Sequence, residues 1–223
     1  MISNYKFHKF VKNKTCNMNL NSLNAVSPID GRYISKSSCL QNYFSESALI
    51  KFRLKVEIEY FIALCSISIP QLKTFPEEMY NEIRSIYIDF SDSDAVRIKS
   101  LENITNHDVK AVEYYIKEKF DTLGLNKYKE FIHFGLTSQD INNTAVPYSI
   151  KQAFDDIYLP ELQEIITQLK KRVKQWQKIP LLARTHGQAA SPTRMGKEIN
   201  VFIERIEIQL SLIRTIPFSA KFG

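Results

Sequence analysis

The stretch LLARTHGQAASP, residues 181–192, decides how the chain around it is organised. It follows a helix that must end near Pro180 and precedes one that opens near Pro192, so it predicts a short connection between two helices. Its one histidine, His186, exchanges a proton near neutral pH, and a turn leaves it open to a ligand. Gly187 allows a substrate to approach closely. An isolated histidine in a polar turn is also often structural, so other motifs must decide between the two interpretations.

Apolar residues recur at helical spacing on both sides of this stretch. Before it, the stripe over residues 150–176 predicts a long helix that opens at Pro147 and kinks at Pro160. After it, Ser191 caps a second long helix whose stripe covers residues 195–213. Two such helices joined by a short loop are expected to pack antiparallel, as in a helix bundle.

Shorter helices are predicted upstream. One opens at Ser45 and fades near residues 66–70, and a second starts at Pro76. A third begins at Ser91, which has the spacing of a capping box with Asp94, and a fourth carries the stripe over residues 109–120. Only six glycines occur in 223 residues, which also favours long helices over many short strands. The predicted fold class is therefore all-α.

Composition excludes several classes of protein. No apolar run approaches the roughly 18 residues that a membrane span needs. Cys16, Cys39 and Cys65 are odd in number and widely spaced, which argues against a disulfide scaffold or a zinc site and fits a reducing cytoplasm. Residues 1–17 lack the apolar core of a secretory signal and are expected to be a disordered basic extension.

The net charge of +6 and the pI near 9.1 leave two kinds of partner open. A basic helical module could bind RNA, and a lysine-rich cluster at residues 170–174 fits that interpretation, although the charge is scattered and no aromatic stacking motif accompanies it. A basic balance equally suits a pocket for a polyanionic small molecule.

Two polar motifs in the first half could bind anions. In SPIDGRY, residues 27–33, a proline and an Asp-Gly pair predict a turn that presents Arg32 and Tyr33. In TNHD, residues 105–108, a helix start carries polar side chains that either cap the helix or hold an anion, and the sequence does not choose between these roles.

A third polar helix start follows at Thr137 and Ser138, where Thr137 and Asp140 have capping-box spacing. Its hydroxyl groups are expected to be free to meet a ligand. His133, among aromatic and aliphatic neighbours, is expected to be a core histidine.

Taken together, four segments resemble the adenylosuccinate lyases of the bacterial type, within the fumarase and aspartase superfamily. They are SPIDGRY (27–33), TNHDVKAVEYY (105–115), EFIHFGLTSQDINN (130–143) and IPLLARTHGQAASPT (179–193). The resemblance covers about residues 20–223, and four matches in the family's order are far more specific than any one.

The resemblance implies an all-helical fold with three parts. These are a disordered basic extension (1–19), a small N-terminal helical domain (20–130) and the first part of a central helical-bundle domain (131–223). It further implies a cytoplasmic homotetramer without metal or organic cofactor, acting on a nucleotide and not on nucleic acid or membranes.

The implied reaction is a β-elimination that splits adenylosuccinate into AMP and fumarate, and likewise splits succinyl-aminoimidazole carboxamide ribotide (SAICAR) in purine synthesis. The resemblance makes His186 the general acid that protonates the leaving nitrogen. Arg32 and Tyr33 would hold the phosphate, and Thr137 and Ser138 a carboxylate of the succinyl part.

Asn106, His107 and Asp108 would also bind the substrate, with His107 near the phosphate. The family's base is a serine on a GSSxMPxKxNP loop, and these 223 residues contain no such segment. The chain is therefore expected to be about the N-terminal half of a lyase and inactive alone. The alternatives are another superfamily lyase, such as one for argininosuccinate, or a non-catalytic truncated subunit. Gln139 stands where the family commonly has glutamate.

Overall fold

The computed structural model describes residues 23, 25–67 and 69–221. The chain divides into two compact units, Met1–Cys39 and Leu40–Gly223, and each is described by itself. The basic extension predicted for residues 1–19 lies outside the described residues. The domain boundary predicted near residue 130 stays a prediction.

The first unit contains the predicted turn. The Gly31 N–H donates to the Ser27 carbonyl at 3.1 Å, and the Tyr33 N–H donates to the Pro28 carbonyl at 2.9 Å. A short helix, α1 (Ile34–Ser37), follows directly. The turn therefore presents Arg32 and Tyr33 from a fixed backbone, and both side chains are exposed.

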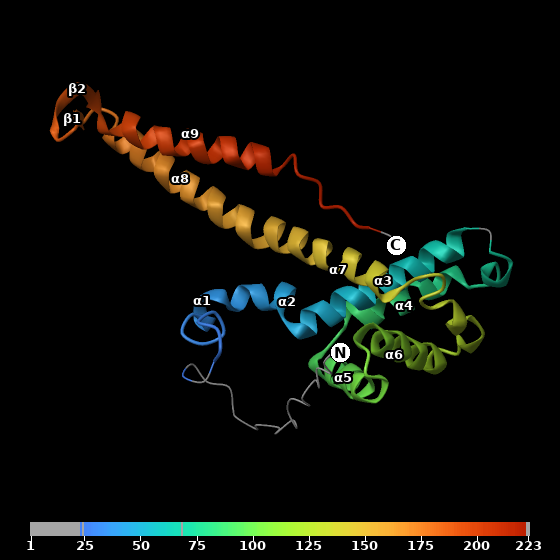
Figure 1. Ribbon diagram of the computed structural model, residues 1–223. Helices are drawn as coiled ribbons and strands as arrows, with labels where there is room; N and C mark the ends of the chain where they lie inside the picture. The colour runs from blue at the N-terminus through green and yellow to red at the C-terminus, as the bar shows by residue number, and fades with distance from the viewer. Residues whose placement is uncertain (1–22, 24, 68, 222–223) are drawn as a thin grey trace, which may run out of the picture. The chain divides into compact units, whose positions relative to one another are not determined.

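The second unit begins with η1 (Ser38–Leu40) crossing into it and then packs helices around one apolar core (Figure 1). Its first helices and 3-10 turns are α2 (Gln41–Phe44), α3 (Glu46–Ser66), η2 (Pro70–Leu72), η3 (Glu77–Met79), α4 (Tyr80–Ile88), α5 (Asp92–Thr105), α6 (Asp108–Thr122) and η4 (Asn126–Phe131). Leu54, Ile58 and Phe61 of α3 are at most 1% exposed, so α3 is the central helix of this core.

The helix starts predicted at Ser45 and Ser91 are confirmed. The Ser45 hydroxyl accepts a hydrogen bond from the Ala48 N–H at 3.1 Å and caps α3. Ser91 and Asp94 form the predicted capping box at α5. The helix expected from Pro76 begins instead with η3 and becomes α-helical at Tyr80.

A long, nearly continuous helix leaves the core. It consists of α7 (Ser138–Ala153), the π-helical turn η5 (Phe154–Tyr158) and α8 (Leu159–Trp176). The prediction that Pro147 opens this helix is wrong, because the Thr137 capping box starts it earlier and Pro147 lies inside α7. The disturbance predicted at Pro160 takes the form of the π turn immediately before it, since proline cannot donate to the preceding turn.

The last helix, α9 (Met195–Ile213), returns antiparallel to α8 as predicted (Figure 1). Ile166, Ile203 and Leu210 form the buried seam between the two helices, and Lys170 pairs with Glu207 at 2.7 Å. The pair α8–α9 is called the arm below.

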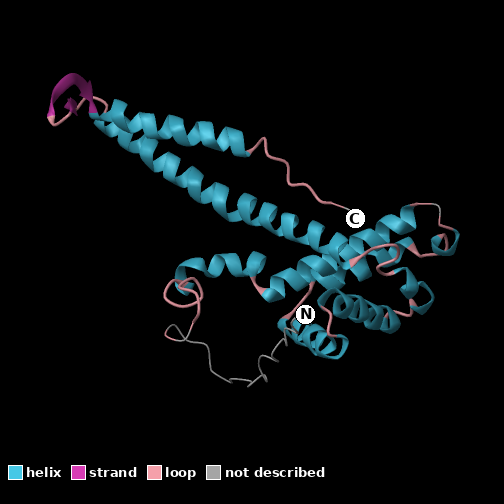
Figure 2. Cartoon of the chain, viewed as in Figure 1, coloured by secondary structure: helices cyan, strands magenta, loops and turns pink. Residues whose placement is uncertain are grey.

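The arm ends in two strands that the sequence did not predict (Figure 2). Strands β1 (Pro180–Thr185) and β2 (Gln188–Arg194) pair antiparallel, with Leu182 opposite Pro192. The predicted helix over residues 195–213 is confirmed, but its predicted start is wrong: Ser191 and Pro192 belong to β2, and α9 starts at Met195. The all-α class is otherwise confirmed, and no helix in the described ranges is long and apolar enough to cross a membrane.

Gly196 sets how closely the two helices of the arm approach. A Cβ atom at this position would lie 2.7 Å from the Gln177 Cα and 2.8 Å from the Val173 carbonyl oxygen. Both neighbours are backbone, so neither can move aside cheaply.

We expect Gly196→Ala to destabilise the arm by about 1–3 kcal/mol, because the added methyl forces the helices apart. Urea unfolding followed by the fluorescence of Trp176, the only tryptophan, measures it. Asn200→Ala, at an exposed position of α9, is the control and is expected to change the midpoint far less, since alanine favours the helix. Equal midpoints for both variants would contradict the close approach.

Candidate functional site

The first predicted site motif forms a tight turn between α5 and α6. Asn106 has a left-handed backbone (φ 50°) and ends α5, while His107 caps α6 by accepting the Lys110 N–H on Nδ1 at 3.1 Å. The capping residue is thus His107. In a neutral ring this arrangement places the proton on Nε2, which is left to face a ligand.

Side chains of the turn satisfy the first N–H groups of α6. Asp108 Oδ1 accepts the Val109 N–H at 2.8 Å, and Thr105 Oγ1 accepts the His107 N–H at 3.3 Å. The capping role therefore accounts for this backbone. A ligand here meets side chains and not a bare helix end.

Arg53, from the middle of α3, fixes this turn to α7. Its Nη2 pairs with Asp108 Oδ2 at 2.6 Å, and its Nε donates to Asn142 Oδ1 at 2.9 Å. The Arg53 side chain is 7% exposed and that of Asp108 is 42% exposed. Burial works to raise the pKa of Asp108, but the hydrogen bond from Val109 and the charge of Arg53 outweigh it and leave the pKa below its usual value.

A cavity of about 470 Å³ opens over this cluster. Its lining is polar and consists of Glu46, Arg53, Glu102, Asn103, Asn106, His107 and Asp108. Lys99 binds both glutamates, at 3.1 Å and 2.7 Å, which offsets their negative charge at the rim. The cavity therefore offers amide, imidazole and guanidinium donors together.

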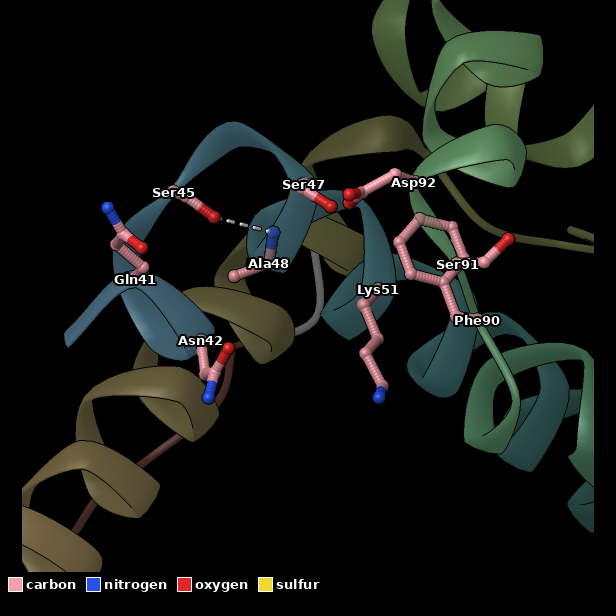
Figure 3. A pocket seen from close by; sticks show the side chains of 9 residues that line it. All are labelled: Gln41, Asn42, Ser45, Ser47, Ala48, Lys51, Phe90, Ser91 and Asp92. Atoms are coloured by element: carbon pink, nitrogen blue, oxygen red, sulfur yellow. Dashed lines mark hydrogen bonds between the residues drawn. The ribbon is translucent and has the colours of Figure 1, made fainter. Parts of the chain in front are cut away.

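A second cavity, of about 530 Å³, lies beside α3 and contains none of the predicted site residues (Figure 3). Lys51 and Ser45 line it, and Lys51 is two residues from Arg53, about 200° around the helix. Although it is larger, this cavity is not the candidate site.

The start of α7 carries the next predicted residues. Asp140 Oδ2 accepts both the Thr137 N–H at 2.8 Å and the Thr137 hydroxyl at 2.9 Å, which completes the predicted capping box. The expectation that both hydroxyls are free is wrong for Thr137, because its hydroxyl donates to Asp140 in the capping box. Ser138 lies one turn before Asn142 on the same helix face. Arg53 thus brings Ser138 and the Asn106–Asp108 turn to the same region.

His186 occupies a different place from the one expected. It forms, with Gly187, the two-residue loop of the β1–β2 hairpin, and both have positive φ, 51° and 76°. This is the type I′ geometry that matches the twist of paired strands. His186, Arg184 and Gln188 are all exposed at the tip of the arm.

The chain therefore does not gather all of its predicted site residues. Asn106, His107, Asp108 and Ser138 lie around Arg53, whereas His186 lies at the end of α8 remote from α7 (Figure 1). The 18 residues of α8 alone span about 27 Å. Arg32 and Tyr33 lie in the first unit, where the Arg32 guanidinium stacks 5.4 Å from the Tyr33 ring centre.

Sequence reasoning missed Arg53, Glu57 and Asn142. Arg53 and Glu57 have i, i+4 spacing and so share one helix face, but α3 also carries Lys51, Lys55 and Glu59, so the sequence alone does not single them out. Their partners are 76 to 89 residues away in sequence or, for Asp108, 55, so no local pattern points to them.

Comparison with known proteins shows the family to which the chain belongs. The family named Lyase matches residues 31–217, and the chain belongs to this family. It is 52% identical over 94% of its length to the adenylosuccinate lyase of Dictyostelium discoideum and 44% identical over 92% to that of Vibrio cholerae. The chain spans about 46% of the length of each of these relatives.

Solved structures of similar fold agree with this class. A fumarate lyase from Mesorhizobium sp. BNC1 superposes with a TM-score of 0.62 at 18% identity, over 79% of this chain and 39% of that one. A β-carboxy-cis,cis-muconate cycloisomerase from Acinetobacter calcoaceticus gives 0.59 at 17% identity, over 80% and 40%. At such identities the likeness concerns the fold alone.

We expect Asp108→Asn to destabilise the chain by about 1–2 kcal/mol, less than the roughly 3–5 of a fully buried pair because solvent reaches Asp108. The folded-state pKa of Asp108 is lowered, so its contribution is present above the unfolded value near 3.9 and is lost as pH falls. Urea unfolding at pH 7 and at about pH 3 measures both effects.

The control for this experiment is Asp121→Asn, which removes an exposed carboxylate paired with Lys129. It is expected to cost at most about 1 kcal/mol. If the difference in free energy of unfolding between Asp108→Asn and the unsubstituted chain stayed constant down to pH 3, the ion-pair interpretation would be contradicted.

Proposed function

We propose that this chain is part of a cytoplasmic adenylosuccinate lyase, which splits adenylosuccinate into AMP and fumarate and SAICAR into its carboxamide ribotide and fumarate. The observation that carries the proposal is the similarity of nearly the whole chain to relatives of that name. The DGRY turn together with the Asn106–Asp108 turn favours a nucleotide over argininosuccinate as substrate.

The chemistry needs a proton donor and anion-binding groups. In the elimination, a proton leaves the carbon next to a carboxylate, the C–N bond breaks, and its electron pair goes to the nitrogen, which takes a proton. His186 is the proposed donor to that nitrogen. The proposed substrate contacts are Arg32 and Tyr33 for the phosphate, Asn106, His107 and Asp108 for the nucleotide, and Thr137 and Ser138 for a carboxylate.

The arm bears on how such a site is completed. His186 stands at its tip, apart from Asn106–Asp108 of the same chain, so we propose that the site forms between copies of a homotetramer. Apolar side chains exposed along the arm support this assembly, among them Ile165 (51%), Phe202 (58%) and Leu212 (54%). Burying them between copies would bring one copy's His186 to another's Arg53 cluster.

We expect His186→Gln, in the longest reading frame that contains these residues, to lower kcat for adenylosuccinate by about 10²–10⁴-fold, because general acid catalysis is lost. Release of fumarate measures it. Lys73→Gln, an exposed residue after η2, is the matched control and is expected to keep full activity. Full activity in His186→Gln, or release of fumarate from argininosuccinate instead, would refute the assignment.

The 223 residues alone are expected to release no fumarate, because they contain no serine loop to remove the carbon-bound proton. Steady-state assay of the purified chain, with the adenylosuccinate lyase of Dictyostelium discoideum as positive control, measures this. Turnover by the chain alone would show that another residue serves as the base.

A further inference from the structure

The polar face of α3 contacts every segment of the second unit's core that carries a proposed substrate-binding residue. Arg53, Glu57 and Tyr60 follow one another at i, i+4 and i+7, so they share one face. Arg53 binds Asp108 and Asn142, Glu57 binds His133, and the Tyr60 hydroxyl donates to the Phe134 carbonyl at 2.9 Å.

Glu57 is the unusual member of this row. Its side chain is 0% exposed, and Oε1 lies 2.5 Å from His133 Nδ1. Its other oxygen, Oε2, is buried and has no hydrogen-bond partner in the described ranges. Burial raises the pKa of Glu57, and the hydrogen bond to Glu57 raises the pKa of His133.

Stability alone does not explain a carboxylate at this position. When both partners of a buried pair are replaced by apolar side chains of similar size, stability is often unchanged or higher. Glu113, itself buried, adds a second negative charge near the pair, and Lys110 and Lys117 neutralise it at 2.7 Å and 3.1 Å. Burying these charged groups therefore costs free energy of folding. This indicates that Glu57 serves to fix the local backbone geometry.

The geometry that Glu57 holds is strained. His133 has φ 61°, a left-handed conformation that a non-glycine residue seldom adopts, and Gly135 two residues later has φ 75°. These two residues lie in the turn just before Thr137: the Leu136 N–H donates to the His133 carbonyl at 3.3 Å, and the capping box then starts α7. The start of α7, and so the place of Ser138, follows from this turn.

We propose that Glu57 is a positioning residue: through His133 it holds the left-handed turn that sets the start of α7 and so places Ser138 one helical turn before Asn142, the residue that Arg53 binds. The expected effect of Glu57 on substrate binding rests on the proposed function. Its effect on the conformation of the turn before α7 does not. Glu57 touches no substrate itself and acts only through His133.

The test compares Glu57→Leu, which removes the bond, with Glu57→Gln, which keeps a hydrogen bond to the ring without the charge. In the purified chain, Glu57→Leu is expected to lower the thermal unfolding midpoint, because His133 Nδ1 is left without its partner. Amide exchange at residues 137–140 is expected to rise at least tenfold, while exchange in the α8–α9 seam stays constant. Glu57→Gln should restore slow exchange to within about threefold.

In the longest reading frame, Glu57→Leu is expected to raise KM for adenylosuccinate at least tenfold with a smaller change in kcat, and Glu57→Gln to rescue it. Glu59→Gln, two residues along α3 and paired with Arg84, is the control and should change neither. If Glu57→Leu fails to fold, Tyr60→Phe, which removes the bond to Phe134, should still raise exchange at residues 137–140.

The outcomes separate the two proposals. Unchanged amide exchange at residues 137–140 in Glu57→Leu would overturn the positioning role. So would a KM for adenylosuccinate that changes with the unfolding midpoint and not with exchange at residues 137–140. Faster exchange at residues 137–140 in a protein whose longer reading frame never acts on adenylosuccinate would uphold the positioning role and overturn the proposed function.

Discussion

The contact of one buried guanidinium with two distant segments is the constraint on which the candidate site depends. Arg53 reaches Asp108 with Nη2 and Asn142 with Nε, and so ties the α5–α6 turn to α7. A planar fork donates in two fixed directions, which a lysine ammonium cannot reproduce. Because the guanidinium is buried, losing either acceptor leaves a charge poorly paired away from water. The α5–α6 turn and α7, which carry proposed substrate-binding residues, are therefore held by the core itself.

The rest of the second unit separates binding from proton transfer. Proposed binding residues lie on the core, and the proposed acid stands at the tip of the arm. The run α7–η5–α8 is nearly continuous, so the helix that starts at Ser138 also carries the hairpin that bears His186. The seam of Ile166, Ile203 and Leu210, closed at one end by Gly196, stiffens that connection. Such an arm suits a site built between copies better than one folded within a chain.

Local interactions were the predictable part of this structure. The capping boxes at Ser91 and Thr137 need only a residue and its neighbour three positions on, and both are present. The hairpin was not predictable, because its strands are mostly exposed on both faces and show no alternation, and its loop is His-Gly instead of Asn-Gly. The proposed site residues were named from motifs and from the family resemblance, and their roles stay predictions. Their separation, and the role of Arg53, depend on contacts between residues far apart in sequence.

At the tip of the arm, the backbone conformation of His186 is fixed by the hairpin and not by packing of side chains around the loop. A Cβ atom added at Gly187 would meet nothing within 4 Å, so the loop owes its shape to no neighbouring side chain. Its shape comes instead from the pairing of Thr185 with Gln188 and from an irregularity between Leu182 and Arg184, which increases the twist of the strands. His186 keeps φ 51° within this frame. In the proposed assembly, the chain thus presents its imidazole in a backbone geometry already set, so that little ordering remains when another copy receives it.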